Sequence, residues 1–252
     1  MHTGHSLSVS FIAKLFPDRV VKFNQYNADR PDWLEGSIPV SARYGDIYFS
    51  ADDPLGETRH VFLAGNGLPG RFRPGFHVAE LGFGTGLNML AVLAEWCASG
   101  IEGRLTYTGF EAHPLQVNDI ERALSPFTEL SFHLHPVLSA LREGQRVIQT
   151  PSLQAELVTG DARTTLPLWD GRADAWFLDG FSPSCNPELW EDDLLAKLPE
   201  RTAPDGTFAT FTAAGRVRRA LTAVGFSVER TAGFGRKRHM LRGRLNAESR
   251  SK

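Results

Sequence analysis

Residues 76–88 read Phe-His-Val-Ala-Glu-Leu-Gly-Phe-Gly-Thr-Gly-Leu-Asn, and a helical pattern continues from them to about Ala98. The segment starts as a buried strand and breaks into alternating glycines before that helix. Glycines there allow a tight turn and a close approach of the backbone to a ligand. The helix presents unpaired N–H groups and a positive dipole end to the same place. This order predicts the first strand–turn–helix unit of a nucleotide-binding sheet.

The spacing of these glycines favours one class of ligand. A dinucleotide fingerprint requires a glycine at the position of Leu87. Glu80 precedes the first glycine by two residues, and its charge would repel a pyrophosphate but suits a cationic ligand with an amino acid moiety. This combination favours S-adenosylmethionine over NAD, with a plain structural turn as the alternative. The predicted cofactor-binding residues here are Glu80, Gly82, Phe83, Gly84, Thr85, Gly86 and Asn88.

Two further carboxylates follow predicted strands. The run 105–110 ends in Glu111, and a carboxylate at the tip of the second strand can accept both hydroxyls of a ribose. The run 155–158 leads to Asp161, which is placed to accept the exocyclic amine of adenine. The structural alternatives are a solvated strand end for Glu111 and a helix cap for Asp161.

A second prominent stretch, residues 174–190, reads Asp-Ala-Trp-Phe-Leu-Asp-Gly-Phe-Ser-Pro-Ser-Cys-Asn-Pro-Glu-Leu-Trp. Its apolar run ends abruptly at Asp179, which is the pattern of a buried strand that delivers a carboxylate at its carboxyl end. Asn186 then suits a helix N-cap, with Pro187 as the first helical residue. Open α/β sheets bind ligands at such strand ends. On these residues alone, a capped strand-to-helix turn fits equally well.

The remaining pattern completes a sheet of class α/β. Strands are expected at 207–211, 226–230 and 240–243, which predicts a mostly parallel, seven-stranded, Rossmann-like sheet with an antiparallel edge strand. Residues 38–63 read as short strands and turns of a β-hairpin, including Ile47-Tyr48-Phe49 and Val61-Phe62-Leu63. We expect an amino-terminal arm and hairpin extension over 1–70, the Rossmann-like domain over 71–245 and a tail over 246–252.

Composition narrows the function classes without naming one. The chain has 252 residues, with 27 basic and 29 acidic side chains, so its net charge neither supports nor excludes nucleic acid. Its two cysteines lack the spacing of metal ligands, which argues against a disulfide framework or a metal site. No signal peptide or bilayer-spanning run is evident, so we expect a soluble cytoplasmic protein without membrane partners.

Several segments together resemble one known family, the methyltransferase part of the bacterial tRNA 5-methylaminomethyl-2-thiouridine biosynthesis enzymes. The matching segments are 48–50, 57–63, 82–88, 174–190, 209–215 and 233–238, and the resemblance runs from about residue 40 to 243. It implies a class I fold and methyl transfer from S-adenosylmethionine to the aminomethyl nitrogen at C5 of a wobble uridine in tRNA. Some members are fused to a flavin-dependent oxidase, whereas this chain resembles the stand-alone form. It departs from the family pattern at Ala112-His113 and Ser184-Cys185.

The resemblance and the chemistry of amine methylation together suggest roles for individual residues. We expect Asp179 to bind at the cofactor, to anchor the substrate nitrogen and to assist its deprotonation. The predicted substrate-binding residues are Phe181 and Trp190 as apolar or cation–π walls, with packing as the alternative role of Trp190. Arg216, Arg236, Lys237 and Arg238 are predicted to contact the anticodon region of tRNA. The enzymes that make the aminomethyl precursor are possible partners. The alternatives are a methyltransferase of the same fold that acts on another RNA or a small amine, and a non-catalytic binding module.

Overall fold

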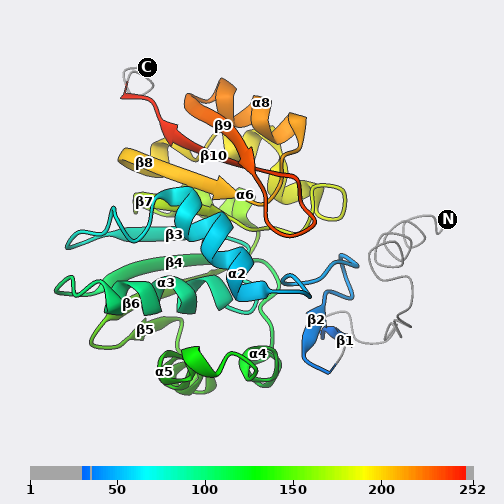
Figure 1. Cartoon of the computed structure of the whole chain (residues 1–252), viewed down its shortest axis with the longest axis vertical. Coiled ribbons are helices and arrows are strands. Elements are labelled where there is room, and N and C mark those ends of the chain that lie inside the picture. The colour runs from blue at the N-terminus through cyan, green and yellow to red at the C-terminus, as the bar shows by residue number, and fades with distance from the viewer. Residues whose placement is uncertain (1–29, 35, 248–252) are drawn as a thin grey trace.

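The computed structural model describes residues 30–34 and 36–247. They form an eight-stranded sheet in the order β5-β6-β4-β3-β7-β8-β10-β9, with a separate two-stranded hairpin (Figure 1). The amino-terminal arm expected up to residue 26 lies outside the described residues, as does most of the expected tail. The α/β class, the mostly parallel sheet and the amino-terminal hairpin are all confirmed.

The seven strands expected from the sequence are all present. The five parallel strands are β3 (His77–Leu81), β4 (Leu105–Glu111), β6 (Leu153–Thr159), β7 (Ala173–Leu178) and β8 (Thr202–Thr210). They are joined by β9 (Phe226–Ala232) and β10 (His239–Leu245). A short eighth strand, β5 (Val147–Gln149), pairs antiparallel with β6 at one edge.

The antiparallel strand β10 lies one place in from the sheet edge. It pairs with β8 on one side and with β9 on the other, antiparallel to both. Helix α8 (Gly215–Ala223) carries the chain past the position next to β8, and the short connection from β9 then returns the chain into that gap. The edge strand on this side is therefore β9.

Helices cover both faces of the sheet and produce two buried clusters. The first cluster includes residues of α3 (Leu87–Ala98), α4 (Val117–Leu124) and α5 (Ser131–Arg142). The second includes residues of α6 (Ala162–Thr165), α7 (Asp192–Leu195) and α8. Strand β7 supplies Phe177 to the first cluster and Trp176 to the second, because successive side chains of a strand point to opposite faces. This explains why β7 is apolar from Ala175 to Leu178.

The hairpin lies earlier in the chain than the sequence pattern indicated. It consists of β1 (Asp32–Leu34) and β2 (Ile38–Val40) and packs beside α4, where the Arg122 guanidinium lies 3.9 Å from the centre of the Trp33 ring (Figure 1). The expectation of strands at 47–49 and 61–63 was wrong. Residues 47–49 form only an isolated bridge at Ile47.

Residues 54–66 are helical. Helix α2 (Pro54–Thr58) continues through further helical turns at Arg59–Leu63 and Ala64–Asn66. Asp53 caps α2 by accepting a hydrogen bond from the Gly56 backbone N–H at 2.8 Å. An apolar run as short as 61–63 cannot distinguish a strand from a buried helical turn. These residues enter the first core cluster, and the boundary expected at residue 70 stays a prediction. Within the described residues, no helix is long and apolar enough to cross a membrane.

Candidate active site

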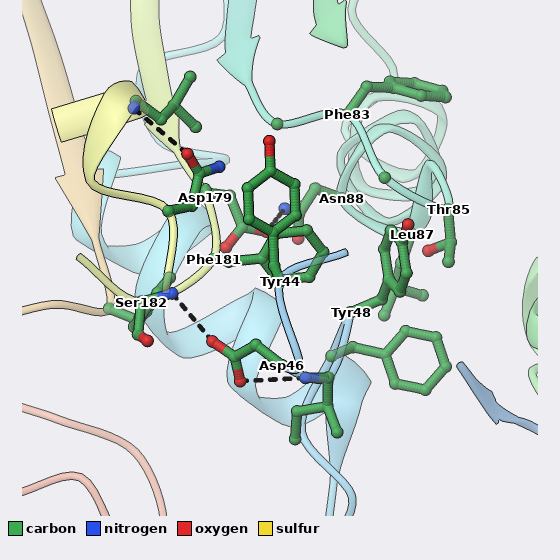
Figure 2. Close-up of a pocket in the computed structure, with 18 of the residues that line it drawn as sticks. Tyr44, Asp46, Tyr48, Phe83, Thr85, Leu87, Asn88, Asp179, Phe181 and Ser182 are labelled. Carbon is green, nitrogen blue, oxygen red and sulfur yellow. Dashed lines mark hydrogen bonds between the residues drawn. The ribbon is translucent and has the colours of Figure 1, made fainter. Parts of the chain in front are cut away.

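A cavity of about 630 Å³ opens at the carboxyl ends of the central strands. The turn after β3, the end of β4 and the loop after β7 form its floor, while residues 43–58 and the loop between β9 and β10 form the opposite walls. Because β3 has its parallel neighbours β4 and β7 on opposite sides, this is the switch point at which open α/β sheets hold their ligands. Figure 2 shows the close-up.

The glycine turn after β3 is shaped by close backbone contacts. Gly82 has φ +86°, and a Cβ there would lie 2.4 Å from the Asp179 carbonyl oxygen. A Cβ at Gly84 would lie 3.1 Å from Cδ1 of Tyr48, and one at Gly86 would lie 2.8 Å from Cζ of Phe83. Glycine is thus required where the turn packs this closely against its own neighbours. Contact of the turn with a cofactor stays a prediction.

The carboxylate of Glu111 is fixed at the end of β4. Its Oε2 accepts a hydrogen bond from the Gly84 backbone N–H at 2.9 Å, and its Oε1 accepts one from the His113 N–H at 2.8 Å. Each carboxylate oxygen retains a second lone pair that can accept a ribose hydroxyl. Glu111 lines the cavity, so the geometry suits the predicted ribose role.

Asp161 both caps a helix and lines the cavity. Its Oδ1 accepts from the Arg163 backbone N–H at 2.9 Å, and its Oδ2 forms an ion pair with the Arg163 guanidinium at 2.6 Å. These Arg163 hydrogen bonds hold the pKa of Asp161 below its ordinary value. The capping alternative is therefore present, and it keeps an ionised acceptor beside the cavity.

Asp179 follows β7 and belongs to a network of hydrogen bonds at the cavity floor. The Asn88 side-chain amide donates to Asp179 Oδ2 at 2.6 Å and to Glu80 Oε1 at 2.7 Å. The Tyr107 hydroxyl donates to Glu80 Oε2 at 2.6 Å. Thr58 Oγ1 donates to Asn88 Oδ1 at 2.8 Å. Glu80 is fully buried, so it acts on the cavity only through these partners.

Burial dominates the electrostatics of the two carboxyl groups. It raises the pKa of Asp179 to about 7, with the nearby Glu57 and Asp46 adding to the rise and Lys237 opposing it. Burial and the charge of Asp179 raise the pKa of Glu80 well above its ordinary value. A carboxyl group with a pKa near 7 exists in both protonation states at neutral pH, which suits proton transfer.

The loop after Asp179 contributes Phe181 to an aromatic wall of the cavity, and hydrogen bonds hold this loop in place. The Phe181 ring lies 5.0 Å from Tyr44 and 5.0 Å from Tyr48, and all three line the cavity (Figure 2). Trp190 is buried and donates its Nε1–H to the Phe181 carbonyl at 2.8 Å. Arg216 in turn donates to the Trp190 carbonyl at 2.8 Å. Trp190 and Arg216 are not among the described residues that line the cavity. Their hydrogen bonds hold the loop after Asp179 in place.

The predicted basic loop, residues 236–238, lies between β9 and β10 and is tied to the start of α2. Lys237 Nζ lies 2.8 Å from Glu57 Oε1 and 4.1 Å from the centre of the Phe211 ring. Arg236 Nε lies 3.6 Å from Asp52 Oδ2. Arg236 and Lys237 line the cavity. Arg238 is exposed and is not among the described lining residues.

The amino-terminal wall of the cavity has no predicted role in the site. Its lining residues include Tyr44, Asp46, Tyr48, Glu57 and Thr58. Asp46 Oδ2 accepts the Ser182 N–H at 2.9 Å and joins this wall to the loop after Asp179 (Figure 2). The segments 48–50 and 57–63 were part of the family resemblance, and this was the one signal that could have marked the wall.

No metal ligand set is evident in the part of the chain that the structure describes. Residues 30–34 and 36–247 contain no group of three or more His, Cys, Asp or Glu side chains placed to hold a metal ion. The residues around the cavity instead suit an organic cation that carries hydroxyl groups. They provide a side-chain-free glycine cradle, the fixed Glu111 carboxylate and the acidic floor at Asp179.

Comparison with known proteins gives the class of this one. A family model described as S-adenosyl-L-methionine-dependent methyltransferase matches residues 126–246. The fold, with its glycine turn and its cavity at the switch point, has the features of that class. The chain is thus an S-adenosyl-L-methionine-dependent methyltransferase.

Relatives with curated names indicate the family within this class. The chain is 46% identical over 222 residues to the tRNA 5-methylaminomethyl-2-thiouridine biosynthesis bifunctional protein MnmC of Caulobacter sp. (strain K31), a match that covers 83% of this chain and 37% of that protein. It is 42% identical over 229 residues to the protein of the same name from Marinobacter nauticus, with 84% and 36% covered. The chain belongs to the MnmC methyltransferase family and spans little more than a third of the length of these relatives. The resemblance found in the sequence is confirmed.

Solved structures agree on the fold. The structure of MNMC2 from Aquifex aeolicus superposes with a TM-score of 0.71 at 24% identity and covers 97% of this chain and 78% of that one. Spermidine synthase from Thermotoga maritima gives a TM-score of 0.50 at 14% identity, with 80% and 62% covered. At these identities the likeness is one of fold.

Proposed function

We propose that this methyltransferase transfers a methyl group from S-adenosyl-L-methionine to the nitrogen of a 5-aminomethyl-2-thiouridine at the wobble position of tRNA, which gives 5-methylaminomethyl-2-thiouridine. The observation that carries the proposal is the placement of the Asp179 carboxyl group, which lines the cavity directly beside the glycine turn. Burial, which raises its pKa to about 7, suits it to proton transfer. The names of the relatives supply the identity of the amine and of the RNA. We assign the methyl-transfer step alone to these residues.

The cofactor would be held chiefly by three of the predicted parts of the site, namely the glycine turn, Glu111 and Asp161. The glycine turn would lie against the cofactor, Glu111 would accept its ribose hydroxyls and Asp161 would accept its adenine amine. When bound, S-adenosyl-L-methionine supplies an electrophilic methyl group for in-line attack by the amine. The aromatic wall of Phe181, Tyr44 and Tyr48 would exclude water from this space.

Asp179 would prepare the substrate nitrogen for attack. A primary alkylamine is mostly protonated near neutral pH, and the ammonium form has no lone pair to donate. Burial lowers the pKa of an amine and raises that of a carboxyl group, which brings the two closer together. The proton would then pass from the nitrogen to Asp179, and the freed lone pair would form the new N–C bond while the bond from sulfur to the methyl carbon breaks and S-adenosylhomocysteine leaves.

The tRNA would approach through its anticodon region. Arg236, Lys237 and Arg238 lie on the loop beside the cavity, where they can contact phosphates while a flipped wobble base enters. Phosphate groups would compete with Glu57 and Asp52, whose ion pairs with this loop are partly exposed. Arg216 would contribute by supporting the loop below the base. Such a substrate places the reaction in the cytoplasm, beside the enzymes that make the aminomethyl precursor.

The proposal is tested with labelled S-adenosyl-L-methionine and tRNA that lacks the final methyl group. We expect label in 5-methylaminomethyl-2-thiouridine when the nucleosides are analysed by mass spectrometry. The matched control is the same tRNA already methylated, which should accept no label. Label in another nucleoside or in a small amine would contradict the assigned substrate and support a different one within this class.

A further inference from the structure

The side chain of Asn88 has no hydrogen-bond donor left for a ligand. One N–H of its amide is directed to Glu80 Oε1 and the other to Asp179 Oδ2. Its Oδ1 accepts from the Thr58 hydroxyl. An amide has two donors, so Asn88 could donate to the cofactor only by releasing one of the carboxylates.

The surroundings fix the orientation of this amide. Asn88 and Thr58 are only 6% and 4% exposed, and they come from helices α3 and α2, respectively. The two carboxylates require the amide nitrogen on their side, and the Thr58 hydroxyl donates to the oxygen on the other. A flipped amide would place its oxygen against two carboxylate oxygens and its nitrogen against a donor.

The same contacts differentiate the two oxygens of Asp179. Oδ2 is held by Asn88 at 2.6 Å. No described residue donates a hydrogen bond to Oδ1, although Asp179 lines the cavity. The carboxylate therefore keeps one oxygen available to a ligand.

We propose that Asn88 and Thr58 are positioning residues, which hold Asp179 so that its Oδ1 accepts the substrate ammonium group. This inference rests on the proposed function, because it assigns the substrate amine to that oxygen. It gives Asn88 a role that acts through Asp179 in place of direct contact with the cofactor. It also makes α2, a segment outside the glycine turn and the β7 loop, part of the catalytic arrangement.

Charged groups from several elements act on Asp179 along with this pair. Glu57 on α2 and Asp46 before it raise its pKa, while Lys237 on the loop after β9 lowers it. Glu80 on β3 faces it across the Asn88 amide. The hydrogen bond from Asn88 stabilises the ionised form, so loosening that bond must raise the pKa of Asp179 further.

The decisive variant is Thr58→Val, which keeps the shape of the side chain and removes its hydroxyl donor. We expect kcat for tRNA methylation to fall about tenfold. The KM for tRNA and the Kd for S-adenosylhomocysteine, measured by calorimetry, should stay within about twofold. Thr58→Ser, which retains the hydroxyl, should restore kcat. Thr108→Val removes an equally buried hydroxyl that bonds His77 away from the cavity, and it should leave kcat unchanged.

A second measurement needs no substrate. Carbon NMR of protein labelled at the aspartate carboxyl carbons follows the titration of Asp179, whose signal is assigned by its loss in Asp179→Asn. In Thr58→Val the midpoint should rise by about half a pH unit, and in Thr58→Ser it should not. An unchanged midpoint together with unchanged kcat would overturn the positioning role. A wild-type protein that shows this titration but does not methylate tRNA would contradict the proposed function alone.

Discussion

At the scale of single residues, Asp179 owes its character to its location. Strand β7 is buried on both faces and ends immediately before this residue, whose carboxyl group accepts a hydrogen bond from Asn88 at the cavity floor. Burial raises its pKa to about 7, above the ordinary value of a carboxyl group. The ionised form, which can accept a proton, is therefore lost as the pH falls below 7.

The pH profile of the reaction should report this carboxyl group. We expect kcat/KM to rise with pH through an apparent pKa of about 7, because the base must be ionised to accept the proton. The profile would be recorded by single-turnover methylation of tRNA from pH 5.5 to 9. A rising limb at an ordinary carboxyl pKa, about 4, would contradict the assignment.

Removing the carboxylate should abolish turnover. We expect Asp179→Ala to lower kcat by at least about 100-fold while cofactor affinity, measured by calorimetry, changes little. The control Asp193→Asn neutralises an exposed carboxylate on α7 and should behave as wild type. Unchanged turnover in Asp179→Ala would exclude the residue as the base.

At the scale of elements, the glycine turn joins two adjacent strands. Gly82 after β3 contacts the backbone of Asp179 after β7, so neither loop can move without the other. Helix α2 completes this arrangement through the Thr58–Asn88 hydrogen bond. The Asp179 carboxyl group, the proposed base, is thus located by three segments that are distant in the sequence.

Replacing Gly82 by alanine should lower the stability of the protein by more than the backbone strain of a positive φ alone would. In Gly82→Ala the new Cβ lies 2.4 Å from a carbonyl oxygen, and the residue has φ +86°. We expect the free energy of unfolding to fall by about 2–4 kcal/mol and cofactor affinity to fall with it. Gly75→Ala is the matched control, because φ is +75° with nothing within 4 Å of the added atom. It should cost only about 1 kcal/mol in denaturant unfolding, and equal losses in both variants would contradict the contact argument.

At the scale of the whole molecule, the cavity lies where the sheet, the amino-terminal wall and the basic loop meet. The net charge of −2 provides no general attraction for tRNA. The proposed recognition of tRNA would then depend on local cations, and the loop at 236–238 places such groups at or beside the cavity. The phosphates of a bound tRNA would lie against this loop.

Neutralising the loop should weaken tRNA binding and reduce its salt dependence. With Arg236, Lys237 and Arg238 each changed to Gln, we expect the slope of log K against log salt to become less steep by about 2, because fewer counterions are released. Arg104→Gln, at the opposite end of β4, is the control and should leave the slope unchanged. The slope is obtained from tRNA binding measured by fluorescence anisotropy at several salt concentrations. An unaltered slope in the triple variant would exclude these contacts.

The features predicted correctly are those encoded by short contiguous patterns. The glycine turn, the strands that end at Glu111 and Asp179, and the helix cap at Asp161 each depend on fewer than about ten neighbouring residues. The strand expected at 61–63 is a helical turn, because three apolar residues are too few to show a strand or helix period. For the same reason the sequence placed the amino-terminal hairpin too late in the chain. The roles of Trp190 and Arg216 as supports required knowledge of which carbonyls they reach.

The sequence by itself determined the class of fold, the cofactor class and the carboxyl group at the centre of the site, because strand periodicity and glycine spacing are local properties. Only the tertiary structure decided how that carboxyl group is held. Thr58 reaches Asn88 across 30 positions, and Asp46 reaches the loop at Ser182 across 136. Such contacts depend on packing of distant segments around the sheet, which no local pattern encodes.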